Sequence, residues 1–212
     1  MRLLVIDTAT AACSVALIEG DHVIAAAHDQ VGRGHAERLV SMIAALPDGG
    51  RAERIAVDCG PGSFTGIRVG VAAARGLGLG WGIPVHGYSS LPMLAASHFA
   101  ADPACPAVAI VIEGGHGEVF MQGFTPNPLT ATAPMQSLKP DAAIAALGGR
   151  VAVGNGVRFL AAIDAALPLI DALPVAANAR YLPAPFIQLD PKPIYGRAPD
   201  AIPSVPKTGI AR

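Results

Sequence analysis

The sequence predicts an α/β protein in which one arrangement of strands and helices occurs twice along the chain. Short apolar runs rich in branched residues open the chain and alternate with polar turns, which indicates buried strands. From His35 onward the apolar residues recur at spacings of three and four, which is typical of an amphipathic helix. A similar order of elements returns after residue 106. Together these observations indicate two tandem units of the β-β-β-α-β-α type.

The first hundred residues predict five strands and three helices in the order β-β-β-α-β-α-β-α. The first three strands are joined by short turns, so we expect an antiparallel meander. Pro47 ends the first helix, and Ser89 or Ser90 is expected to cap the third. The expected strands are Leu3–Ile6, Cys13–Ile18, His22–Ala27, Ile55–Val57 and Pro84–His86, and the expected helices are His35–Leu46, Thr65–Gly80 and Ser89–Ser97.

The second half is predicted to begin after a linker at Pro103–Pro106. The expected strands are Ala107–Ile112, Glu118–Phe124, Leu129–Ala133 and Val151–Val153, and the expected helices are Asp141–Leu147 and Val157–Ala166. Tandem units of this kind describe the duplicated fold shared by actin, sugar kinases and Hsp70. We therefore expect an N-terminal domain over residues 1–102. A smaller, degenerate C-terminal domain should span 103–212, with an irregular proline-rich tail from Pro168.

Composition excludes several classes of protein. The chain has 212 residues, a net charge of −1 and 15% charged residues, which is too apolar for a disordered protein. The balanced charge argues against binding nucleic acid through bulk charge. Three widely spaced cysteines indicate neither a disulfide framework nor a zinc ribbon. No signal peptide or long apolar run occurs, so we expect a soluble cytoplasmic protein.

The turn Asp7-Thr8-Ala9-Thr10 joins the first two strands and has two interpretations. In actin-like folds this hairpin presents a carboxylate and hydroxyls to nucleotide phosphates or a hydrated metal, a role that suits hard oxygen ligands. Alternatively, Asp7, Thr8 and Thr10 satisfy only their own backbone. The spacing alone favours the second interpretation.

The most informative stretch is the glycine-rich turn of residues 60–68, which reads GPGSFTGIR. Its glycines permit close approach of a partner, and Ser63 or Thr65 can cap the helix that follows. The stretch is not a Walker A loop, because it lacks the required lysine. A phosphate-facing loop and a tight strand-to-helix turn both remain open.

Small residues follow along the next helix at spacings of four, at Gly66, Gly70, Ala74 and Gly78. Such a row lets a second helix approach closely. Since each glycine costs about 1 kcal/mol of helix propensity relative to alanine, close packing should offset it. That packing is either internal or with a partner helix.

No candidate catalytic or metal-binding residues emerge from the spacing of the side chains. The six histidines form no HxxxH or HExxH pair, and His35 with Glu37 fits a helix start. No Ser-His-Asp arrangement or GxSxG elbow is present. We expect no bound metal.

Several of these motifs together resemble the TsaB (YeaZ) family. The resemblance is dense over the first hundred residues and sparse afterwards. It differs at Glu113–His116, where the family usually has an Asp-Ala-Arg-type turn, and at Leu182–Ile187, where a helix is expected. The matching segments are LVIDTAT at 4–10, CSVAL at 13–17, HAERL at 35–39, GPGSFTGIRVG at 60–70, SSL at 89–91, GEVF at 117–120 and PIYGR at 193–197.

The resemblance implies an actin-like, Hsp70-like fold without catalysis of its own. The family's partner TsaD, a paralogue with an HxxxH metal site, transfers a threonylcarbamoyl group from its adenylate to N6 of adenosine 37. Its substrates are tRNAs reading codons that begin with A. The resemblance implies a heterodimer with TsaD that the ATPase TsaE joins, a homodimer when alone, and contact with tRNA only through the complex. We expect no firmly bound cofactor and no membrane contact; ATP or ADP would bind at the interface of the complex.

The resemblance also assigns residues to roles. The vestige of the phosphate hairpin would be Asp7, Thr8 and Thr10. The signature turn would comprise Gly60, Pro61, Gly62, Ser63, Phe64, Thr65, Gly66 and Arg68. The partner interface, on the first two helices, would comprise His35, Leu39, Met42, Ile43, Leu46, Gly70, Ala73, Ala74 and Leu77.

Two other function classes stay open. The chain could be an independently active, actin-like ATP-dependent phosphotransferase or acyltransferase, which would need a carboxylate or metal pair beyond Asp7. It could also be a peptidase, for which the sequence offers no nucleophile or metal set. ATP turnover and protein digestion by the isolated chain distinguish these classes.

Overall fold

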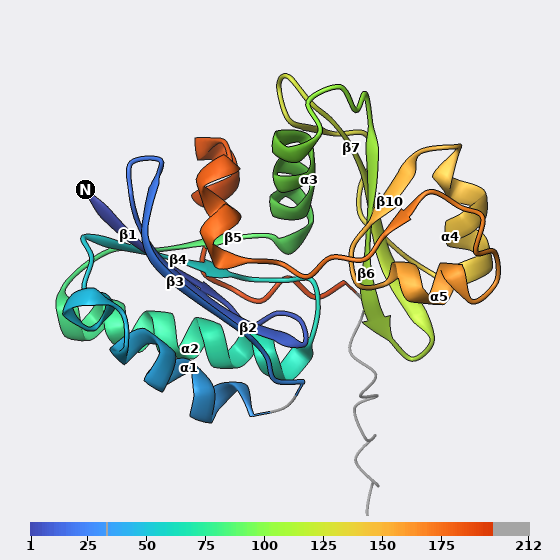
Figure 1. Cartoon of the computed structure of the whole chain (residues 1–212). Coiled ribbons are helices and arrows are strands. Elements are labelled where there is room, and N and C mark those ends of the chain that lie inside the picture. The colour runs from blue at the N-terminus through green and yellow to red at the C-terminus, as the bar shows by residue number, and fades with distance from the viewer. Residues whose placement is uncertain (33, 197–212) are drawn as a thin grey trace, which may run out of the picture.

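A computed structural model of the chain describes residues 1–32 and 34–196 and contains two β-sheets (Figure 1). The first sheet has the strand order β3-β2-β1-β4-β5. Its strands are β1 (Arg2–Asp7), β2 (Ala12–Glu19), β3 (His22–Gln30), β4 (Arg54–Asp58) and β5 (Val85–Tyr88). The first three strands form the predicted antiparallel meander, and β4 and β5 continue the sheet parallel to β1.

Helices cover both faces of the first sheet. On one face lie α1 (His35–Ala44) and α2 (Phe64–Trp81), with the short 3-10 turn η1 (Pro47–Gly50) after α1. The other face is covered by α3 (Ser90–Ala101), which stands between the two sheets (Figure 1). Leu4 and Ile6 of β1 face α1 and α2, and Leu3 and Val5 face the opposite side. Burial on both faces explains why β1 is apolar throughout.

The second sheet has the order β11-β10-β6-β7-β8, with β9 also paired to β7. Its strands are β6 (Val108–Gly115), β7 (Glu118–Thr125), β8 (Thr130–Ala131), β9 (Gln136–Leu138), β10 (Val151–Val153) and β11 (Leu169–Ile170). One face packs against α3, and the other is covered by α4 (Pro140–Leu147) and α5 (Val157–Ala161).

The two sheets share one topology, which confirms the duplicated actin-like fold. In each sheet, the antiparallel hairpin partner of the central strand lies on one side of it. On the other side lie two parallel strands in succession, the first of which pairs with the central strand. The central strands are β1 and β6. The second copy is reduced, since β10 has three residues and β11 two.

The segment after β11 returns to the first sheet. The 3-10 helix η2 (Ala176–Tyr181) packs against β2 and α3, and η3 (Ala184–Ile187) packs against β5. Leu189 then forms an antiparallel bridge with Gly87. The expected domain limits at 1–102 and 103–212 stay a prediction. Arg197 of the PIYGR motif lies outside the described residues.

Element boundaries differ from the sequence-based expectation at a few places. The helix expected over Val157–Ala166 ends at Ala161, and α3 continues to Ala101. Ser89 occupies the N-cap position of α3, but its side chain makes no capping hydrogen bond. The very short β9 and β11 were not predicted. Among the described helices, none has the length and apolar character needed to cross a membrane.

Candidate functional site

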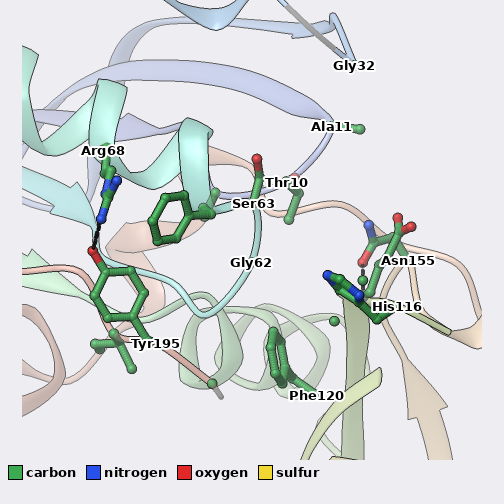
Figure 2. A pocket seen from close by; sticks show the side chains of 17 residues that line it. Thr10, Ala11, Gly32, Gly62, Ser63, Arg68, His116, Phe120, Asn155 and Tyr195 are labelled. Atoms are coloured by element: carbon green, nitrogen blue, oxygen red, sulfur yellow. Dashed lines mark hydrogen bonds between the residues drawn. The ribbon is translucent and has the colours of Figure 1, made fainter. Parts of the chain in front are cut away.

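A cavity of about 760 Å³ lies where the two halves of the molecule meet (Figure 2). Four turns and loops form its wall: the β1–β2 turn, the start of α2, the β6–β7 turn and the segment before residue 197. The lining residues are Ala9, Thr10, Ala11, Gly32, Gly62, Ser63, Phe64, Arg68, Glu113, Gly114, Gly115, His116, Phe120, Asn155, Ile194, Tyr195 and Gly196. Such a crevice between two lobes is a common location for a small-molecule site.

An aromatic and cationic cluster forms one side of this cavity. The Arg68 guanidinium lies 3.5 Å from the centre of the Phe64 ring and donates to the Tyr195 hydroxyl at 3.1 and 3.2 Å. Figure 2 shows Arg68 and Tyr195 pointing at one another. The Arg68 guanidinium therefore already has two partners within the protein, the Phe64 ring and the Tyr195 hydroxyl.

The opposite side of the cavity comes from the second half of the chain. Asn155 lies after β10, and its side-chain oxygen accepts from the Glu113 backbone N–H at 3.1 Å. The Glu113 carboxylate is paired with Arg158 at 2.6 Å. His116 and Asn155 stand across the cavity from Arg68 (Figure 2). Glu113–His116, where the sequence departs from the TsaB pattern, thus lines the cavity itself.

Of the three predicted phosphate-hairpin residues, only Thr10 lines the cavity. Asp7 is fully buried and accepts from the Tyr88 hydroxyl at 3.0 Å. Thr8 Oγ1 donates to the Gly66 carbonyl at 2.7 Å, and Thr10 Oγ1 accepts from the Ala12 N–H. These side chains hydrogen-bond to the backbone and to neighbouring side chains. This arrangement agrees with the interpretation that the turn satisfies its own polar groups and does not face a phosphate.

Asp7 shares its site with a second carboxyl group, that of Asp58. The two strands that end in Asp7 and Asp58 are adjacent and parallel, which brings the two buried carboxyl groups close enough for each to shift the pKa of the other. Asp58 also accepts from the Gly60 N–H at 2.7 Å and the Ser90 hydroxyl at 2.5 Å. Burial raises the pKa of Asp7, and burial with the neighbouring Asp7 charge raises the pKa of Asp58 well above its usual range. Two buried carboxylates side by side repel each other, so the raised pKa values favour a proton shared within the pair.

Sequence reasoning missed Asp58, Tyr88 and Ser90 as members of this network. One signal could have identified them. Parallel strands place their carboxyl ends at the same edge of a sheet, so an aspartate ending each of two neighbouring strands predicts a close pair.

The signature turn packs against the β1–β2 turn, and Gly62 and Ser63 also line the cavity. The Ser63 N–H donates to the Ala9 carbonyl at 2.6 Å, and Ser63 Oγ caps α2 by accepting from the Gly66 N–H. A Cβ atom at Gly62 would clash with the Ala9 carbonyl, and one at Gly66 would clash with the Thr8 carbonyl. The tight-turn interpretation therefore accounts for these glycines. Thr65 lies inside α2 and is exposed.

Most of the residues predicted for the partner interface pack inside the chain itself, and their part in a partner interface stays a prediction. Leu39, Met42, Ile43 and Leu46 belong to the core between α1 and the first sheet. Ala74 is fully buried, and Ala73 and Leu77 are partly buried against the same core. Apolar side chains at spacings of three and four indicated a buried face correctly, but the protein's own sheet covers that face.

His35 and Gly70 show how this burial works. The buried Nε2 of His35 lies 2.9 Å from the Thr10 carbonyl and 3.2 Å from that of Ala12, which fastens α1 to the β1–β2 turn. A Cβ atom at Gly70 would meet Thr8 Oγ1 and Val57. Both residues therefore serve internal packing.

The outer faces of α1 and α2 are exposed and carry apolar and small residues among charged ones such as Glu37, Arg38 and Arg75. Val40 on α1 and Leu79 on α2 expose 65% and 88% of their surface. Small exposed residues accompany them, namely Ala36, Ala44, Ala72, Gly76 and Gly80. Large exposed apolar side chains beside small residues are typical of a surface that another protein covers.

The cysteines near these elements are poorly suited to catalysis. Burial raises the pKa of the Cys59 thiol to about 12 and that of Cys13 to about 11. Both are therefore protonated at neutral pH and weak as nucleophiles. Within the described residues, the side chains lining the cavity include no group of three that could hold a metal ion.

Comparison with known proteins identifies the family. The family model for TsaD, tRNA N6-adenosine threonylcarbamoyltransferase, matches residues 25–133. An uncharacterized protein of Mycobacterium tuberculosis is 30% identical over 95% of this chain and 94% of its own length. The tRNA threonylcarbamoyladenosine biosynthesis protein TsaB of Escherichia coli is 38% identical over 57% of this chain. The chain belongs to the TsaB (YeaZ) family.

The structure agrees with this assignment along most of the chain. YeaZ from Pseudomonas aeruginosa superposes with a TM-score of 0.76 and 26% identity, covering 92% of this chain and 99% of that one. The match to the curated TsaB of E. coli, in contrast, spans only 53% of that protein's length. The sequence match to this TsaB thus covers little more than half of the chain, whereas the structural match covers most of it.

Proposed function

We propose that this chain is the non-catalytic subunit of a cytoplasmic complex that forms N6-threonylcarbamoyladenosine at position 37 of tRNA. It would pair with a catalytic TsaD-type subunit, with a TsaE-type ATPase joining them. The curated relatives named TsaB and the TsaD family model support the pathway. tRNA would contact the complex and not this chain alone.

The observation that carries the proposal is the set of exposed apolar and small residues on α1 and α2, which lie among the exposed charges of Glu37, Arg38 and Arg75. Val40 and Leu79 are more exposed than most apolar side chains, and the small residues beside them let another helix approach closely. The proposed interface therefore lies on the two helices that the family resemblance implies. It is formed by the side chains that point outward from these helices, and not by those that point into the core.

The chemistry of the cavity supports a subunit without its own catalysis. The Asp7–Asp58 pair is buried away from the cavity, and Arg68 is engaged by Tyr195. Neither Asp7 nor Asp58 lines the cavity, and the Glu113 carboxylate that does is paired with Arg158, so no unpaired carboxylate among the described lining residues stands ready for a proton transfer. ATP or ADP, if required, would bind where this chain meets its partner.

Reconstitution tests the proposal. The chain is purified with the TsaD-type and TsaE-type proteins of the same organism, and tRNA modification is measured with and without it. We expect modification to require this chain, and the chain alone to hydrolyse neither ATP nor protein. Modification that proceeds equally without it, or ATP turnover by the isolated chain, would overturn the proposal in favour of an independent enzyme.

Variants locate the interface. Val40→Asp and Leu79→Asp should fold normally, since both side chains point to solvent, but should lose capture of the TsaD-type partner. Ile163→Asp is the matched control, because Ile163 is also an exposed apolar residue (52%) but lies after α5 in the second half. If all three variants capture the partner equally well, α1 and α2 do not form the interface.

A further inference from the structure

Three side chains with metal-binding chemistry meet where α3 ends and the chain enters the second half. His98 lies in the last turn of α3, Asp102 is its C-cap residue, and Cys105 follows three residues later. One possible ligand atom from each lies within 4.8 Å of the other two. In a tetrahedral zinc site with bonds of roughly 2.0–2.3 Å, ligand atoms are a little closer than this, so small side-chain rotations would complete the geometry.

The backbone holds the three residues in place. The Asp102 N–H donates to the His98 carbonyl at 2.8 Å, and the Cys105 N–H donates to the Asp102 carbonyl at 3.2 Å. Asp102 Oδ1 also accepts from the Ala104 N–H at 3.2 Å. Spacings of four and three residues thus bring the side chains together through a continuous hydrogen-bonded turn.

One atom in the cluster lacks a partner within the described part of the chain. Nε2 of His98 is buried and makes no hydrogen bond. A buried polar atom in this state is unfavourable, and ligation of a metal by that nitrogen would satisfy it. The Cys105 thiol donates to the Ala107 carbonyl at 3.3 Å, and this proton would be released on metal binding.

The charges and surroundings suit a divalent cation. A thiolate and a carboxylate together carry two negative charges, and the carbonyl end of α3 adds a favourable partial charge. Asp102 is exposed, and a second cavity of about 490 Å³ adjoins Asp102 and Cys105. Water can therefore reach a fourth coordination position.

We propose that His98, Asp102 and Cys105 form a zinc site in the turn that leads from α3 into the second half. Imidazole, thiolate and carboxylate together favour zinc over magnesium or calcium. The proposal opposes the sequence-based expectation of no metal, and it is independent of the proposed role in tRNA modification. The site is separate from the cavity of about 760 Å³, since the two share no lining residue.

Cobalt substitution tests the donor set. Full-length chain is treated with chelator, freed of it and titrated with Co²⁺, then with Zn²⁺. We expect one equivalent of Co²⁺, a near-ultraviolet thiolate-to-cobalt charge-transfer band, and loss of that band as Zn²⁺ displaces the cobalt. Absence of the band, or much less than one metal per chain, would overturn the proposal.

Substitutions assign the ligands. Cys105→Ser, His98→Gln and Asp102→Asn should each weaken zinc binding at least tenfold, and Cys105→Ser should abolish the band. Cys13→Ala is the matched thiol control and should bind zinc unchanged. Asp102 is exposed, so Asp102→Asn leaves the core intact and keeps the test decisive even if Cys105→Ser fails to fold. A charge-transfer band that survives in folded Cys105→Ser would also overturn the assignment.

Discussion

Helix α2 carries two rows of small residues, one on its inner face and one on its outer face. The inner row, Gly66, Gly70, Ala74 and Gly78, lies against the first sheet, where a Cβ atom at any of its glycines would clash. The outer row, Ala72, Gly76 and Gly80, is exposed, and a Cβ at Gly76 or Gly80 would meet nothing within 4 Å. Both rows have the same spacing of four. Spacing therefore identifies a close-packing face, and only the fold tells whether that face is already occupied.

Gly70→Leu should have the largest effect, because it tests the inner row. The leucine side chain would clash with Thr8 and Val57. The loss of stability should therefore exceed the roughly 1–3 kcal/mol that is typical of overpacking. We expect little soluble protein or a strongly lowered Tm, measured by circular dichroism. A folded variant with normal Tm would mean that the inner row is not tightly packed.

Gly76→Leu tests the outer row with the same chemical change. Leucine has about 1 kcal/mol better helix propensity than glycine and enters open space, so the isolated chain should be as stable or slightly more stable. Association with a partner should weaken roughly ten- to a hundredfold if helices meet there. Thermal melting and a pull-down measure the two effects separately. Unchanged association would place the partner elsewhere.

Asp58→Asn tests whether the buried carboxyl pair serves the fold. Because burial holds the pKa of both groups above their unfolded values, their contribution to stability is present below about pH 4 and is lost as pH rises through the folded values. An asparagine mimics the protonated partner without this dependence. The variant should match the natural chain at acid pH and exceed it by on the order of 1 kcal/mol at pH 8.

Urea denaturation at several pH values measures this difference directly. The comparison uses the gap between the two stability curves, since other groups titrate in both proteins. A gap that does not change with pH would contradict the shared proton.

Tyr195→Phe should have the smallest effect. It removes the hydroxyl that accepts from Arg68 but keeps the ring beside Phe64, with centroids 5.5 Å apart. Both partners are exposed, so we expect a change within about 0.5 kcal/mol in thermal melting. A large loss of stability would show that the exposed contact between Arg68 and Tyr195 holds the fold together. That result would contradict the view that the inner row of α2, and not its exposed side, secures the fold.

Much of the fold could be predicted from the sequence because its strands and helices have clear periodicity. The run from Leu3 to Ile6 and the stripe through Leu39 and Ile43 were interpreted correctly as buried surfaces. The second half was harder, since strands as short as Leu169–Ile170 carry too few residues for a pattern. The return of the chain to the first sheet has no local signal.

The candidate site was less predictable, because its contacts join distant segments. Nothing near Arg68 in the sequence indicates Tyr195, and Asn155 meets Glu113 only through the second sheet. The partners of Leu39 and Gly70 depend on which sheet face covers each helix. The His98, Asp102 and Cys105 cluster, in contrast, is local, yet its spacings of four and three residues match none of the common metal-binding motifs.

The return of residues 174–196 to the first sheet has a consequence for biosynthesis. Ser14 accepts a hydrogen bond from the Ala176 N–H at 3.0 Å, and Leu3, Val5 and Ala16 share a core with Ala179 and Leu182. The strands translated first therefore keep part of this apolar face uncovered until Ala179 and Leu182 have left the ribosome. Folding of the N-terminal half is completed only at that point, and a nascent chain stalled at residue 102 would be a substrate for chaperones.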